Sequence, residues 1–107
     1  MIDDVQSAFL EAEIALRAPH EGGRRSAIRS GYRCNCRLNR NDHHVYHDAS
    51  ISLHEIEELS PGSTGYARMY PHHPDDWGGV VAGSTIELCE GPRVVGRAVV
   101  TATSWQS

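Results

Sequence analysis

The stretch GYRCNCRL, residues 31–38, alternates between two kinds of side chain along its length. In an extended strand, one face would carry Tyr32, Cys34, Cys36 and Leu38, and the other face would carry Arg33, Asn35 and Arg37. Buried cysteine behaves as a small apolar residue. The stretch therefore predicts a half-buried strand with its thiols in the core and its arginines outside.

The same alternation recurs along the chain, with glycine and proline between the segments. Further strands are predicted over residues 49–56, 63–70, 84–88 and 93–103. Residues 8–17 also alternate, but Val5, Phe9, Ala12 and Leu16 fit the apolar stripe of a helix equally well, so periodicity leaves this segment open. Six short strands separated by turns indicate an antiparallel barrel or sandwich.

The length of 107 residues fits one domain with its own apolar core. Asp3 and Asp4 stand where a signal peptide needs positive charge, and no apolar run is long enough for a membrane helix. Three cysteines are an odd number for a disulfide framework and fit a reducing compartment. We therefore expect a cytoplasmic protein without a membrane partner.

Positive charge is concentrated in one segment of an acidic chain. The net charge is −4, yet the segment from Arg24 to Arg40 holds six arginines and no acid. The chain has no lysine, so every cationic side chain is a planar guanidinium suited to phosphate or carboxylate. The segment predicts a surface that follows a phosphate backbone. The alternative is a solvated strand face whose arginines pair with carboxylates on neighbouring strands.

Motifs for catalysis and metal binding are weak. Cys34, Cys36, His43, His44 and His47 are a candidate ligand set, but two cysteines separated by one strand residue do not match the usual zinc spacing. No G-x-S-x-G or phosphate-binding loop is present, and no lysine could complete such a loop. We expect no enzyme activity, no nucleotide binding by this chain alone and no cofactor. Metal binding through this set remains an alternative hypothesis.

Several segments carry a more specific signal. They are FLEAEIAL (9–16), EGGRRSAIRSGYR (21–33), SPGSTG (60–65), the pair His73–Pro74 and EGPRVVGRAVVT (90–101). In order and spacing they resemble the third, C-terminal domain of bacterial elongation factor Tu. The resemblance covers about residues 8–102, nearly the whole chain, and we expect a free-standing single domain with short flexible ends. It implies a closed six-stranded antiparallel β-barrel, and it favours a strand over a helix for residues 8–17.

The resemblance also implies a site. The family's barrel is not catalytic, and it contacts the T stem of aminoacyl-tRNA and helps to bind the nucleotide-exchange factor. Arg24 matches an arginine of the tRNA-facing loop, Arg25 stands where a histidine is usual, and Asn35 replaces a glutamine. The implied RNA-binding residues are Arg24, Arg25, Arg33, Asn35, Arg37, Glu90 and Gly91. Contacts of this kind would read the shape and backbone of RNA rather than its sequence.

The sequence departs from the family in several places. The GTPase domain and second barrel have no counterpart within these 107 residues, and the family's R-P-Q-F-Y-F strand has become RCNCRL. Trp77 is a candidate exposed contact, and Cys89 is the cysteine that we expect to be exposed. The leading hypothesis is a non-enzymatic module that binds tRNA. The alternative is a protein-interaction module or mimic that acts on a partner from the translation machinery or from an immunity-type complex.

Overall fold

The segment that fitted both a helix and a strand is a strand in the computed structural model, which describes residues 8–38 and 45–105. Strand β1 (Leu10–Leu16) buries every second side chain, beginning with Leu10. It pairs with β6 on one side and with β8 on the other. Pairing on both edges overrides the helical propensity of this sequence, because tertiary context outweighs local preference.

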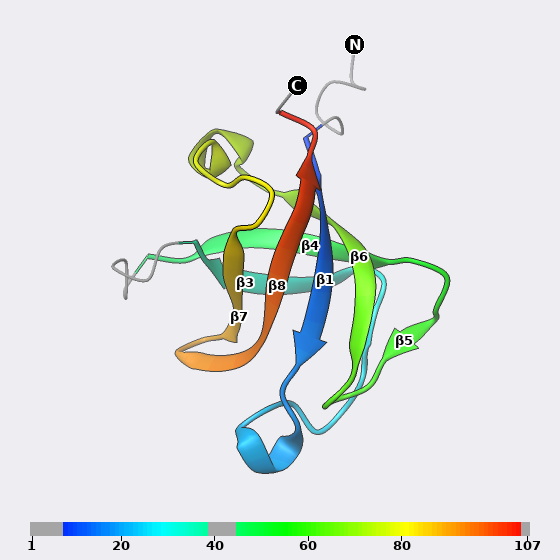
Figure 1. The fold of residues 1–107 in the computed structure, drawn as a ribbon. Helices are drawn as coiled ribbons and strands as arrows, with labels where there is room; N and C mark the ends of the chain where they lie inside the picture. Colours follow the sequence, from blue (N-terminus) through cyan, green and yellow to red (C-terminus); the bar gives the residue numbers. More distant parts are fainter. Residues whose placement is uncertain (1–7, 39–44, 106–107) are drawn as a thin grey trace.

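Six strands of the described chain close into an antiparallel barrel, as the fold prediction stated (Figure 1). In order around the barrel they are β1, β6 (Thr64–Pro71), β4 (His47–Leu53), β3 (Tyr32–Arg37), β7 (Thr85–Glu90) and β8 (Arg93–Thr103). The first and last strands pair with each other, so the sheet has no free edge. A separate pair of two-residue strands, β2 (Ile28–Arg29) and β5 (Glu58–Leu59), was not predicted.

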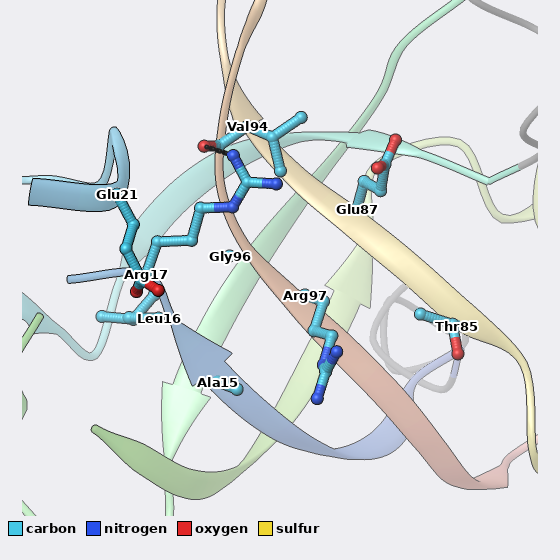
Figure 2. A pocket seen from close by; sticks show the side chains of 9 residues that line it. All are labelled: Ala15, Leu16, Arg17, Glu21, Thr85, Glu87, Val94, Gly96 and Arg97. Atoms are coloured by element: carbon cyan, nitrogen blue, oxygen red, sulfur yellow. Dashed lines mark hydrogen bonds between the residues drawn. The ribbon is translucent and has the colours of Figure 1, made fainter. Parts of the chain in front are cut away.

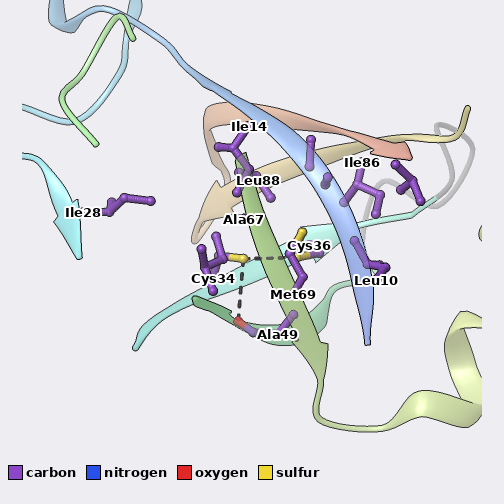
Figure 3. Close-up of a cluster of buried hydrophobic side chains, with 14 of the residues drawn as sticks. Leu10, Ile14, Ile28, Cys34, Cys36, Ala49, Ala67, Met69, Ile86 and Leu88 are labelled. Carbon is purple, nitrogen blue, oxygen red and sulfur yellow. Dashed lines mark hydrogen bonds between the residues drawn. The ribbon is translucent and has the colours of Figure 1, made fainter. Parts of the chain in front are cut away.

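The barrel interior holds the inward faces of these strands, and the cysteines of β3 are among them (Figure 3). Cys34 and Cys36 are both buried, as predicted, with their Sγ atoms 3.1 Å apart and the Cys34 Sγ 3.7 Å from the carbonyl oxygen of Ala49. The hydrogen bond between the two thiols and their burial both raise the pKa of Cys36. A thiol in this setting stays protonated and acts as an apolar filler.

Trp77 does not form an exposed contact, which corrects that prediction. It ends a short 3₁₀ helix, η3 (Pro74–Trp77), and its side chain is completely buried in the core. The ring of His47 packs against it edge-on, with ring centroids 6.5 Å apart. An indole has a large apolar surface, so a tryptophan close to a barrel end is stabilised most by covering the core.

Cys89 is also buried, with an exposed fraction of 1%, and the prediction of an exposed thiol was wrong. It pairs with Asn35 of β3 on one side and with Val94 of β8 on the other, where the β7–β8 register shifts. Burial raises the pKa of its thiol. A one-residue shift of register cannot be read from alternation, because a bulge changes which face a residue occupies.

Two short 3₁₀ helices, η2 (Pro19–Glu21) and η3, are the helical elements of the described chain. Neither they nor any other described segment forms a helix with the length and apolarity needed to cross a membrane.

Candidate nucleic-acid interface

Arg24 lies in the loop between η2 and β2, and its guanidinium has several partners. It forms an ion pair with Glu90, donates from Nη2 to the Ser26 hydroxyl at 3.1 Å, and lies over the ring of Tyr32 at 4.9 Å. Its side chain is only 21% exposed. The glycine-led loop thus carries an arginine that is held in one position rather than free in solvent.

Glu90 is the centre of this arrangement. Its Oε2 accepts a hydrogen bond from the Tyr32 hydroxyl at 2.5 Å and pairs with Arg24, while its Oε1 lies 3.4 Å from Arg93 Nη2. Burial would raise the pKa of Glu90, but the hydrogen bonds from Tyr32 and Arg24 outweigh it and the pKa is lowered. The carboxylate therefore stays ionised and joins the loop, β3 and β8.

A shallow pocket of about 260 Å³ opens where these residues meet. It is lined by Arg24, Arg25, Ser26, Glu90 and Arg93, a set we call the turn cluster. Three guanidinium groups and one carboxylate line the pocket, so the cluster keeps an excess of positive charge. Arg25 is exposed and has no hydrogen-bond or ion-pair partner among residues 8–38 and 45–105.

Gly91 shapes the turn beside the pocket. Its φ of 59° lies in the left-handed region, where glycine is favoured, and it connects β7 to β8 in a tight turn. The turn places Arg93 directly opposite Glu90 in the ladder. The sequence analysis did not include Arg93 in the site. The short turn between β7 and β8 could have indicated it, because such a turn brings the residues at its two ends together.

The outward face of β3 carries Arg33, Asn35 and Arg37, and each has a carboxylate partner. Arg33 Nη2 lies 2.9 Å from Asp48 Oδ2, and Asn35 Nδ2 donates to Asp48 Oδ1 at 2.6 Å. On the other side, Arg37 Nε donates to Glu87 Oε1 at 2.6 Å. On this face, therefore, the arginines pair with carboxylates on neighbouring strands, which was the alternative to a surface that follows a phosphate backbone.

These pairs change the acid–base properties of the groups involved. The hydrogen bond from Arg33 lowers the pKa of Asp48 against the opposing effect of burial, with a further contribution from Asn35. The hydrogen bond to Glu87 raises the pKa of Arg37. A phosphate that approaches β3 therefore meets guanidinium groups already neutralised by carboxylates.

The structure does not assemble the candidate metal ligands. Cys34 and Cys36 face the barrel interior, while His47 lies at a barrel end with its Nδ1 3.7 Å from Asp76 Oδ2. Across the described residues, no three histidine, cysteine or acidic side chains are grouped so that they could hold a metal ion. His43 and His44 lie outside the described residues.

Comparison of the sequence with protein-family models gives no match, and comparison with curated proteins gives no significant one. The resemblance to the C-terminal barrel of elongation factor Tu accordingly stays a prediction.

Proposed function

We propose that the protein is a non-enzymatic binding module that binds structured RNA of the tRNA type through the turn cluster. The observation that carries this proposal is a single pocket lined by Arg24, Arg25 and Arg93, in which Glu90 binds Arg24 and Arg93 and leaves Arg25 without a partner among the described residues. Guanidinium groups bind phosphate oxygens in a bidentate manner, and their planar forks suit an RNA backbone. Glu90 supports the site by holding two of the three arginines in place.

The chemistry of the cluster favours binding over catalysis. Its one carboxylate is occupied by hydrogen bonds and has a lowered pKa, so it is a poor proton acceptor at neutral pH. The cluster presents positive charge on a chain with a net charge of −4. Binding would therefore be local, with few phosphate contacts, weak affinity and a modest dependence on salt.

The arginines of β3 have a secondary part in this proposal. Arg33 and Arg37 lie on the strand next to β7, but Asp48 and Glu87 compete with phosphate for them. RNA phosphates would gain full contact with β3 only by displacing a carboxylate. We therefore assign the primary contacts to Arg25 and Arg93, whose guanidinium groups are the most exposed of the cluster.

The test is the binding of a fluorescently labelled tRNA transcript to the purified protein at low salt, measured by anisotropy. Arg25→Gln and Arg93→Gln should each weaken binding about tenfold, because a charge-assisted hydrogen bond contributes about 1.5 kcal/mol or more. Arg29→Gln is the matched control. It removes the same charge from the same segment, but Arg29 is 71% exposed and pairs with Glu58 on the separate two-stranded sheet.

Two results would overturn the proposal. One is the absence of tRNA binding at low salt. The other is an equal loss of affinity in Arg29→Gln, which would mean that only the total charge matters. A DNA duplex of similar length, run alongside, shows whether the module prefers A-form RNA geometry.

A protein partner is a second candidate, favoured by an exposed apolar pair on another side of the barrel. Tyr66 of β6 is 59% exposed and Ile56 is 42% exposed. The backbone nitrogen of His54 donates to the carbonyl oxygen of Tyr66 at 2.9 Å, so the segment that leads to Ile56 runs beside Tyr66. If this surface is the functional one, Tyr66→Ser should abolish retention of one specific protein while tRNA binding is unchanged.

A further inference from the structure

A groove of about 430 Å³ lies on the outer surface of the barrel, across β1, β8 and β7 (Figure 2). Its floor is formed at Gly96, where β8 lies so close to β1 that a Cβ would be 2.7 Å from the carbonyl oxygen of Ala15. Ala15 and Val94 add small apolar surface to the floor and wall. The volume is in the range of sites that hold small molecules.

Four charged side chains line this groove, and three of them are already engaged. Arg17 Nη1 donates to the carbonyl oxygen of Val94 at 3.4 Å. Glu21 Oε1 accepts a hydrogen bond from the backbone nitrogen of Ala18 at 3.2 Å. Glu87 is bound to Arg37, which lies outside the groove lining.

Arg97 is the exception. It is the register partner of Glu87 across the β7–β8 ladder, yet the Glu87 carboxylate is bound to Arg37 on the opposite side. Arg97 has no hydrogen-bond or ion-pair partner in the part of the chain that the structure describes. Its other register partner is Ala15, which has no polar group to offer its guanidinium.

The charge balance of the lining narrows the class of ligand. Arg37 neutralises Glu87, so Arg17 and Arg97 face only Glu21 and leave one positive charge in excess. A ligand with one anionic group matches this excess, whereas a polyphosphate would be repelled by Glu21. Ala15, Val94 and Gly96 offer apolar and backbone surface to an uncharged body.

We propose that this groove binds a small organic anion, a carboxylate or phosphate monoester, whose anionic group pairs with Arg97 and whose apolar body lies against Ala15 and Val94. The proposal does not depend on RNA binding, because no residue of the turn cluster lines the groove. Arg17, held by the Val94 carbonyl, provides a second donor at the other side of the groove. Arg97 supplies the selectivity for an anion.

The test is a titration of the ¹⁵N-labelled protein with benzoate and with phenyl phosphate, followed by amide chemical shifts. Benzyl alcohol, which has the same ring and no charge, is the matched neutral probe. We expect saturable shifts centred on residues 15–17 and 94–97 for at least one anion, and none for benzyl alcohol. Which anion binds more tightly identifies the anionic group as carboxylate or phosphate.

Two variants test the role of Arg97. Arg97→Gln should weaken binding at least about tenfold, because the anion loses its charge-assisted hydrogen bonds. Ala15→Asp should do the same by giving Arg97 a carboxylate partner across the ladder, and Ala15→Ser is its uncharged control. Arg29→Gln should leave the affinity unchanged. All three positions are outside the core, so the four variants should fold, and amide spectra check this directly.

Any of three outcomes would overturn the proposal: no saturable shift with either anion, equal shifts with benzyl alcohol, or binding that Arg97→Gln leaves unchanged. Shifts confined to the amides of the turn cluster would likewise place the anion outside the groove. None of these outcomes bears on tRNA binding, which is measured separately through Arg25 and Arg93.

Discussion

Strands β3 and β8 lie on either side of β7, and both carry arginines on the outer surface of the barrel. On β3, Arg37 is bound to Glu87 of the middle strand, and Arg33 is bound to Asp48 on the far side. On β8, Arg97 lies opposite Glu87 in the ladder but has no partner among the described residues. One carboxylate lies between two arginines and is bound to only one of them. Because Glu87 pairs with Arg37, Arg97 is the guanidinium that is left available for a ligand.

The largest loss of stability is expected from a change at Glu90, the other carboxylate of β7. It binds Tyr32 of β3 on one side and Arg93 of β8 on the other. Glu90→Gln should lower the free energy of unfolding by about 1 to 2 kcal/mol, because three partners lose a charged acceptor. Urea denaturation measures the loss. The control is Glu58→Gln, since the Arg29–Glu58 pair is exposed and should contribute less than about 0.5 kcal/mol. Equal losses in the two variants would contradict the central role of Glu90.

A smaller loss of stability is expected at acidic pH. The pKa of Glu90 is lowered from 4.5 in the folded protein, so its stabilising contribution is complete above that value and is lost as pH falls below it toward the folded pKa. Glu11 and Asp48 have lowered pKa values too, and they act in the same direction. Unfolding free energies measured at a series of pH values should therefore fall below about pH 4.5. Glu90→Gln should make this decline less steep, and an unchanged slope would count against the ion pair.

The smallest effect is expected from a change at Glu87, which lies between Arg37 and Arg97 and is bound to Arg37. The Arg37 Nε hydrogen should exchange with solvent more slowly than that of Arg97, because only Arg37 Nε donates to Glu87. Glu87→Gln should speed the exchange at Arg37, leave Arg97 unchanged, and lower stability by less than about 1 kcal/mol. Hydrogen exchange of the guanidinium groups, followed by NMR, provides the measurement. Faster exchange at Arg37 than at Arg97 in the unmodified protein would reverse the assignment.

Local alternation was enough to predict much of the fold. It gave β3 with its inward cysteines, and it gave the bounds of β8, because both strands bury one face and expose the other. It could not decide β1, whose residues fit two periods until pairing with β6 and β8 selects the strand. It missed β2 and β5 because two residues are too few to show a period. Trp77 and Cys89 were misplaced for a similar reason, since a 3₁₀ turn and a register shift break the alternation.

The candidate site was less predictable than the fold. The alternation of residues 31–38 correctly placed Arg33, Asn35 and Arg37 on an outward face. Which acids meet these side chains depends on the order of strands around the barrel, where β3 lies between β4, the next strand in the chain, and β7, which is distant in sequence. The sequence around Arg97 did not indicate a binding residue. Arg97 is available to a ligand because Glu87 pairs with Arg37 of β3, and the local sequence does not show that pairing.

The closure of the barrel also has a consequence for how the chain reaches this fold. The backbone nitrogen of Ser104 donates to the carbonyl oxygen of Phe9 at 2.9 Å, and the Phe9 nitrogen donates to the Ser104 hydroxyl at 2.9 Å. These partners are 95 residues apart in sequence. Loop closure over that separation is entropically costly, and proteins rich in such distant contacts fold slowly. The β1–β8 seam is therefore expected to form late, after the hairpin of β7 and β8 has given β1 an edge to pair with.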